Sequence, residues 1–259
     1  MDQPFIPNTM PAQTLTAAPA DLLQSSLEEM LRTLPPKDKY KNAPDEDYGD
    51  VHGDVLGGLL LGPTGAAYLF LQMSARHPEL QLLGHDALYW ARKYMEGDRG
   101  MPAVEDGCCG LVAEKLAFEA ASADSDPGRV QFCHGAPGFT HALQSLRPYY
   151  PALQDQIDRA IEKGYGISWT NGLLKKEPNL CHGLFGNGLA FPKGPRREHF
   201  LALATPDAVA NRKRQDPTLF KAHNYGIDLS VLLGYWPSAA WAWSVYEEDE
   251  PRIFLFNDI

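Results

Sequence analysis

The chain repeats one short pattern, a Gly-x-x-Gly turn that is followed at once by an apolar, alanine-rich run. Clear copies begin at Gly62, Gly107, Gly135 and Gly183, and a degenerate copy begins at Gly234, so that successive copies lie 28 to 51 residues apart. Glycine permits positive φ angles and close backbone approach, so each copy predicts a tight turn that leads into a helix. A period of this length is typical of repeat folds, although glycine-rich turns also occur between helices by coincidence.

Helical patterns lie between these turns, and no stretch shows the period of two that a strand requires. The apolar spacing predicts helices over Ala20–Leu34, Leu80–Met95, Tyr150–Lys163 and His199–Arg214. A turn, an inner helix and an outer helix then form one hairpin, and repeated hairpins can close into a ring. We therefore predict an all-α fold, an α/α toroid, in which residues 21–259 form a single domain behind a loose N-terminal arm, residues 1–20.

The charge of the chain argues against one class of partner. Asp and Glu number 33 against 23 Lys and Arg, which gives a net charge of −10. An acidic surface repels phosphate backbones, so we expect no nucleic-acid partner. The N-terminus lacks an export signal, and the apolar stretch Val55–Met73 is too broken by glycines to span a membrane. We expect a cytoplasmic protein without an integral membrane segment, and association with a membrane surface is left open.

Two of the four cysteines lie in matching turns. Phe132-Cys133-His134-Gly135 and Leu180-Cys181-His182-Gly183 both continue as x-x-Gly, and they lie 48 residues apart. Thiolate and imidazole are preferred zinc ligands, and three protein ligands leave a catalytic zinc one open position. Cys133, Cys181 and His182 are therefore candidate ligands for zinc (Zn²⁺). The alternative is that each cysteine is a small buried packing residue and each histidine is satisfied by a backbone carbonyl.

These motifs resemble those of the lanthionine synthetase C-like (LanC-like) family. The resemblance covers roughly residues 50–250 and is carried by CHGAPGF (133–139) and GLLKKEPNLCHGLFGNGLAF (172–191), with weaker likeness in LLLGPTGAAYLFL (59–71) and GCCGLVAEKLAFEAA (107–121). It implies an α/α toroid of helical hairpins, seven in the family, and a bound zinc. Prokaryotic members add a peptide cysteine thiol to a dehydrated serine or threonine. Eukaryotic members bind zinc and glutathione and can add glutathione to dehydroamino acids.

The resemblance assigns roles to individual positions of this sequence. Cys133, Cys181 and His182 correspond to the three zinc ligands, and Lys176 corresponds to a basic residue of the glutathione-binding members. His134 corresponds to the histidine beside the first ligand and is the candidate catalytic residue, with a purely supporting role as the alternative. Lys175 and Lys176 also have a simpler interpretation as solvated loop charges.

The sequence departs from the family in its length between two turns. Only 28 residues separate Gly107 from Gly135, where the family has two further hairpins, so we expect a toroid with fewer hairpins. The missing part carries the family's histidine that protonates the enolate after thiol addition, and no histidine lies between His85 and His134. A general acid contributes about 10²–10⁴ in rate. Candidate substitutes for it are His52, His85, His141 and His223.

Three functions are compatible with these observations. The first is zinc-assisted addition of a thiol, from glutathione or a peptide cysteine, to an electrophilic alkene acceptor. The second is non-catalytic binding of zinc and glutathione in a regulatory or adaptor role. The third is a tailoring step in small-molecule biosynthesis, because the α/α toroid hosts unrelated chemistries. Two further groups are predicted to be packing residues: Cys108 with Cys109, for which a metal or redox role is the alternative, and the aromatic cluster Tyr235, Trp236, Trp241, Trp243 and Tyr246.

Overall fold

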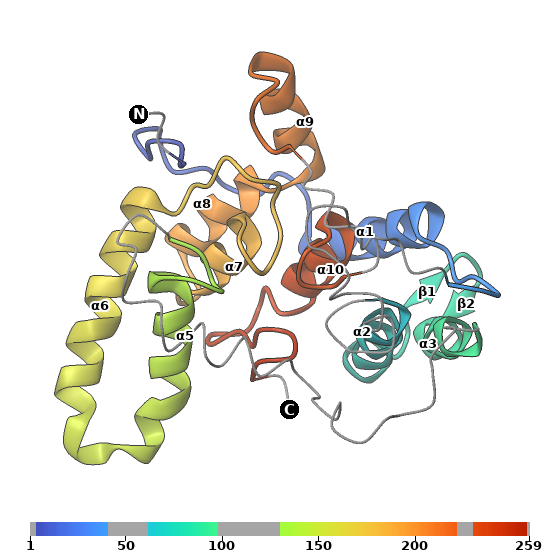
Figure 1. The fold of residues 1–259 in the computed structure, drawn as a ribbon, viewed down its shortest axis with the longest axis horizontal. Coiled ribbons are helices and arrows are strands. Elements are labelled where there is room, and N and C mark those ends of the chain that lie inside the picture. The colour runs from blue at the N-terminus through green and yellow to red at the C-terminus, as the bar shows by residue number, and fades with distance from the viewer. Residues whose placement is uncertain (1–3, 41–61, 98–129, 222–229, 258–259) are drawn as a thin grey trace, which may run out of the picture. The chain divides into compact units, whose positions relative to one another are not determined.

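The computed structural model describes residues 4–40, 62–97, 130–221 and 230–257, and these are mostly helical (Figure 1). The all-α class is confirmed, since the strands in these ranges are one hairpin of two residues on each side. The chain divides into two compact units. In the described ranges the first unit holds residues 4–18, 130–221 and 245–257, and the second holds residues 19–40, 62–97 and 230–244.

The repeated turns precede helices wherever the structure describes them. The copies at Gly62, Gly135, Gly183 and Gly234 lead into α2 (Pro63–Arg76), α5 (Ala136–Leu146), α7 (Leu184–Leu189) and α10 (Tyr235–Ser244). The copy at Gly107 lies outside the described residues, as do Cys108, Cys109, His52 and His223. In the degenerate copy Pro237 stands where the second glycine would be, and the hydroxyl of the next residue, Ser238, donates to the Val231 carbonyl at 2.7 Å.

The second unit is built from helix pairs. α1 (Pro19–Thr33) packs against α10, and α2 packs against α3 (Ala87–Glu96). The apolar positions of α1 recur every three or four residues, and their side chains are buried: Leu22, Leu23, Leu27, Met30 and Leu31. α1 matches the predicted helix within one residue at each end. Trp241 and Trp243 of α10 are also buried, as a packing role requires.

The prediction of one helix over Leu80–Met95 was wrong in its first part. Gln81–Leu82 (β1) pairs with His85–Asp86 (β2) across a turn in which Leu83 and Gly84 both have positive φ. α3 begins only at Ala87, because the Asp86 carboxylate accepts a hydrogen bond from the Tyr89 amide and caps the helix. A turn followed by an N-cap aspartate therefore displaced the start of the helix by seven residues.

The first unit holds two further hairpins. α5 lies beside α6 (Gln154–Asn171), and α7 packs against α8 (Pro195–Leu203) (Figure 1). α6 starts later than predicted because two short 3-10 turns precede it, η4 (Arg147–Tyr149), which contains Pro148, and η5 (Pro151–Leu153), which begins at Pro151. It also continues well beyond Lys163. The single helix predicted over His199–Arg214 is two helices. Thr205 caps α9 (Pro206–Gln215), whose first residue, Pro206, cannot continue α8.

The N-terminal residues, predicted to form a loose arm, are attached to the first unit in this structure. Phe5 pairs with Leu174, the Ile6 amide donates to the Leu173 carbonyl at 2.6 Å, and the Lys175 amide donates to the Pro4 carbonyl at 3.2 Å. The C-terminal segment is held as well. Ile253 and Phe254 are buried.

A buried arginine fastens the C-terminal segment to α8. Arg197 is 1% exposed and donates to the carbonyls of Phe191 (3.0 Å), Tyr246 (3.1 Å) and Asp249 (2.7 Å). Burial lowers the pKa of Arg197 to about 10. It therefore stays charged at neutral pH, and these carbonyls supply the hydrogen bonds that a buried cation needs.

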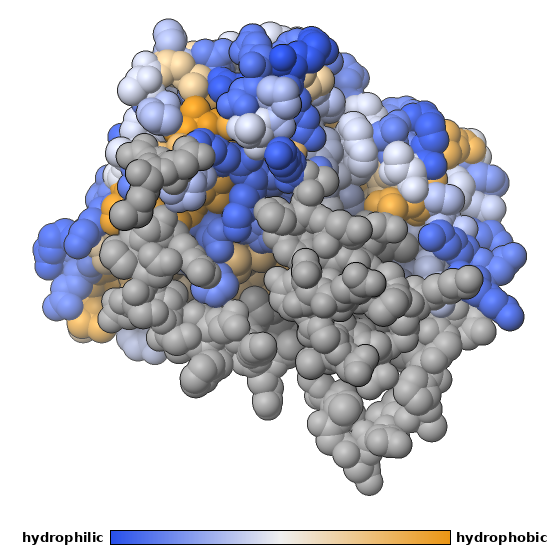
Figure 2. All heavy atoms as spheres, turned by 45° about the horizontal axis from the view of Figure 1, so that its top comes forward, coloured by the Kyte–Doolittle hydropathy of each residue, from blue (hydrophilic) through white to orange (hydrophobic). Residues whose placement is uncertain are grey.

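Hydrophilic residues cover most of the described surface on the face drawn in Figure 2, with small separate hydrophobic areas between them. None of the helices in the described ranges has the length and apolar character needed to cross a bilayer.

Candidate metal centre

The two Cys-His turns share one close backbone approach. A Cβ added to Gly138 would lie 1.9 Å from the Phe132 carbonyl oxygen, and a Cβ added to Gly186 would lie 1.8 Å from the Leu180 carbonyl oxygen. In both turns the second glycine of the motif lies against the carbonyl of the residue six positions earlier, which is the residue directly before the cysteine. The repeated spacing thus encodes a repeated geometry, in which only glycine allows the helix start to pack against the ligand-bearing loop.

The first glycine of each motif is needed for a different reason. Gly135 has φ of 127°, which a side chain rarely tolerates. Gly183 has ordinary extended geometry, but a Cβ there would lie 2.2 Å from the Asn179 amide nitrogen. The first glycine of the motif is therefore required by its backbone conformation at Gly135 and by close packing at Gly183.

Hydrogen bonds join the two turns directly. The Cys133 amide donates to the Cys181 carbonyl at 3.0 Å. Within the second turn, the Asn179 side chain accepts from the His182 amide at 2.8 Å. The amide group of buried Asn187 donates to the carbonyls of Val130 (2.8 Å) and Gly172 (2.9 Å). Neither asparagine was identified from the sequence; a signal for Asn187 was a polar residue within an otherwise apolar helix start.

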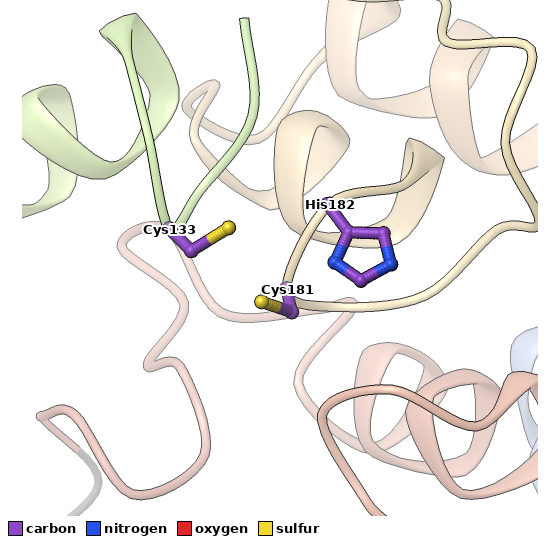
Figure 3. A group of neighbouring side chains, drawn as sticks. All are labelled: Cys133, Cys181 and His182. Carbon is purple, nitrogen blue, oxygen red and sulfur yellow. The ribbon is translucent and has the colours of Figure 1, made fainter. Parts of the chain in front are cut away.

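The three candidate ligands come together in the first unit. Cys133 lies on the loop before α5, while Cys181 and His182 lie on the loop before α7 (Figure 3). Their ligand atoms, two Sγ and one imidazole nitrogen, lie within 4.8 Å of one another. Two sulfurs bound to one tetrahedral zinc at about 2.3 Å stand about 3.8 Å apart. The donor types and their separation therefore fit zinc with small adjustments, and zinc binding itself stays a prediction.

The two thiols influence each other strongly. The pKa of Cys133 lies well below that of an ordinary thiol, because Cys181, His182 and His134 hydrogen-bond to its sulfur and outweigh the effect of burial. The pKa of Cys181 is raised, because it holds the shared proton beside Cys133 and is buried. Without a cation the pair therefore favours a single negative charge. A bound metal ion would favour deprotonation of both.

His134 lies beside the sulfur of Cys133. Its Nδ1 is 3.2 Å from that Sγ, and the Gln131 side-chain amide is 3.4 Å from both atoms. The backbones of Gln131 and His134 also exchange two hydrogen bonds of 3.2 Å. The structure thus places His134 against a candidate ligand rather than apart from the cluster. Gln131 belongs to this group and was not identified from the sequence.

Lys176 lies close enough for its charge to lower the pKa of Cys181. Its backbone forms a parallel bridge with Lys221. Glu177, the next residue, has its pKa raised by burial, and Lys213 opposes that shift. A cation beside the cluster favours negative charge on a sulfur or on a bound ligand.

Neither of the described candidates to replace the missing acid, His141 and His85, is one of the three grouped ligands. His141 is 2% exposed, and its ring meets the Phe132 ring edge-on at 5.7 Å. Burial lowers the pKa of His141 to about 4, so this ring is neutral at pH 7 and has no access to a substrate. His85 belongs to the second unit and stacks on Tyr89 at 3.8 Å.

Comparison with known proteins points to one family. The family profile described as "Lanthionine synthetase C-like protein" matches residues 11–193, which is more than half of the chain. A Danio rerio protein named glutathione S-transferase LANCL1 is 38% identical over 63 residues. That match covers 24% of this chain and 15% of the relative.

Proposed function

Since this chain belongs to the lanthionine synthetase C-like family, we propose that it binds zinc through Cys133, Cys181 and His182 and joins a thiol to an electrophilic alkene. The observation that carries this proposal is the convergence of two thiols and one imidazole from separate turns within 4.8 Å. Three such ligands leave a tetrahedral ion one position for a substrate.

The reaction needs no oxidant or reductant. The S–H bond of the thiol breaks, the sulfur forms a bond to the β-carbon of the alkene, and a proton ends on the α-carbon. A zinc ion held by these residues would lower the pKa of a thiol bound at its open position, so that the sulfur would be a thiolate near neutral pH. The loop residues supply orientation, since the hydrogen bond between the Cys133 amide and the Cys181 carbonyl holds the two turns together.

Two neighbours of the cluster receive roles in this proposal. Lys176 attracts an anionic group of the thiol substrate, because its charge already acts on Cys181. His134 and Gln131 hold the Cys133 sulfur through contacts of 3.2 and 3.4 Å and so orient that ligand. Glutathione is the thiol we propose, since it carries two carboxylates and the Danio rerio relative is named a glutathione S-transferase.

A second candidate is binding of zinc and glutathione without turnover. The burial of His141 favours this candidate. Apart from the histidines of the cluster itself, the described part of the first unit then has no accessible histidine that could act as the family's general acid. Protonation of the α-carbon then depends on water, which slows the reaction by about 10²–10⁴.

One experiment separates these outcomes. The full chain is purified under reducing, chelator-free conditions, and its metal content is measured by mass spectrometry; we expect about one zinc per chain. It is then incubated with glutathione and a dehydroalanine-containing peptide, and the thioether is detected by mass. Product that disappears in Cys133→Ala supports the enzyme, and glutathione binding without product supports the binding role. Absence of zinc refutes both.

Matched lysine variants test the proposed anion contact. We expect Lys176→Gln to weaken glutathione binding several-fold, while Lys175→Gln, which removes a charge that acts on Asp216, has little effect. Equal effects of the two variants would contradict a specific role for Lys176.

A further inference from the structure

The N-terminal segment, defined here as residues 4–15, is held near its C-terminal end by two neighbouring side chains of α8. The Gln13 amide donates to Nδ1 of His199 at 2.9 Å, and the Leu15 amide donates to a carboxylate oxygen of Glu198 at 3.0 Å. The second ring nitrogen of His199, Nε2, lies 2.9 Å from Oδ1 of Asn8. His199 therefore contacts the segment at two points, five residues apart.

These contacts require one protonation state of the ring. A backbone amide can only donate, so Nδ1 of His199 must be the acceptor. The Asn8 side-chain nitrogen donates to the Trp169 carbonyl at 2.9 Å, which leaves Oδ1 of Asn8 as the acceptor for Nε2–H. His199 is thus the neutral Nε2–H tautomer. A second proton on Nδ1 would face the Gln13 N–H and abolish that hydrogen bond.

The surroundings of the ring favour the neutral state. His199 is fully buried, and its ring lies against that of Trp169 at a tilt of 49°, with 5.1 Å between ring centres. The charged groups around it are Arg212 on α9, Glu198 on α8 and Arg196, which lies over the ring of Trp169. Burial, with a smaller effect of Arg212, lowers the pKa of His199 below its ordinary 6.5.

The other end of the N-terminal segment lies along the loop that leads to the candidate metal centre. Phe5 pairs with Leu174, and hydrogen bonds join Ile6 to Leu173 and Lys175 to Pro4. Lys176 is the next residue of that loop, and Cys181 follows five residues later. The segment is therefore a strap, attached to α8 at one end and to this loop at the other.

We propose that His199 is a pH-dependent latch that fastens the N-terminal segment across the first unit and thereby positions the loop carrying Lys176. The latch is a property of the fold alone. Only its consequence for glutathione binding through Lys176 rests on the proposed function. Because burial lowers the pKa of His199 below its ordinary 6.5, the closed strap keeps its full stability above about pH 6.5 and loses it as the pH falls through that lowered pKa.

The latch is tested by amide hydrogen exchange of the full chain, read by NMR at Gln13 and Leu15 and corrected for the intrinsic effect of pH. We expect protection of Leu15 at pH 7.5 to fall about fivefold or more at pH 5.0. Gln13→Pro removes the donor without touching α8, so Leu15 should lose protection at pH 7.5 already. Gln13→Ala keeps the amide and should behave as the wild type, which makes it the matched control.

Two changes at position 199 separate titration from packing. His199→Asn offers an amide oxygen near the place of Nδ1 that does not titrate, so protection of Leu15 should become independent of pH between 5.0 and 7.5. His199→Phe keeps an aromatic ring on Trp169 but has no acceptor, so protection should be low at both pH values. Equal protection of the wild type at pH 5.0 and 7.5, or equal protection in Gln13→Pro and Gln13→Ala, would overturn the latch.

The link to Lys176 is tested by a double-mutant cycle on glutathione affinity at pH 7.5. Gln13→Pro should weaken binding several-fold relative to Gln13→Ala, and combining it with Lys176→Gln should add no further loss. Additive losses would refute the positioning role. If the wild type binds no glutathione, the proposed function fails, while the exchange data still decide the latch.

Discussion

Gly186 provides the sharpest test of the repeated turn. In Gly186→Ala the new Cβ would lie 1.8 Å from the Leu180 carbonyl oxygen, whereas Cβ contacts below 3.0 Å are essentially absent from real proteins. The opposing atom belongs to the backbone, so no side-chain rotation relieves the clash, and residues 179–181 must move by about 1 Å or more to restore a normal contact. The loop that moves is the one that carries Cys181.

The cost follows from two contributions. Overpacking of a buried site costs about 1–3 kcal/mol. The Gly186 amide also donates to the Asn179 carbonyl at 3.2 Å, and losing that hydrogen bond adds about 1 kcal/mol. We therefore expect the free energy of unfolding, measured by urea titration, to fall by about 2–4 kcal/mol, and zinc affinity to fall with it because Cys181 is displaced.

The same substitution at Gly166 is the matched control. Gly166 is an exposed residue in α6 with open space around its missing Cβ. Gly166→Ala should leave stability unchanged or raise it by up to about 1 kcal/mol, since alanine favours the helix. If Gly186→Ala unfolds within about 0.5 kcal/mol of the wild type and binds zinc normally, the close-approach argument is wrong for both turns.

Three further outcomes are expected. Arg197→Met should lower the free energy of unfolding, measured by urea titration, by at least about 3 kcal/mol, because it leaves buried carbonyls without a donor. Arg196→Met, on the exposed side of α8, should lower it by about 1 kcal/mol or less. Similar losses in the two variants would contradict the role of Arg197. Burial lowers the pKa of His141 in the folded protein to about 4. The contribution of neutral His141 to the free energy of unfolding is therefore complete above pH 6.5, and up to about 3 kcal/mol of it is lost as the pH falls from 6.5 to 4. His141→Phe should flatten that part of the profile of stability against pH, and an unchanged slope would refute the assignment. Removing zinc with a chelator should lower the melting temperature of the wild type measured by circular dichroism but not that of Cys133→Ala, and equal shifts would count against Cys133 as a ligand.

Local patterns in the sequence were sufficient for the repeated turns, for α1 and for the chemistry of the candidate ligands. The helix class follows from apolar spacing, and glycine positions mark turns, because both depend on residues close together in the chain. Helix boundaries failed where a cap or proline acted over a few residues, as at Asp86 and Pro206.

Only the tertiary structure decided which distant groups meet. The repeat relates Cys133 to Cys181, but it does not show that the Cys133 amide reaches the Cys181 carbonyl. The burial of His141 and the attachment of Gln13 to His199 follow from no sequence period at all. Such interactions depend on how hairpins pack, and differences of a few tenths of an ångström in backbone position decide which groups meet. The sequence thus determined which donor atoms are present, and the fold determined that two thiols and one imidazole lie close enough to share an ion.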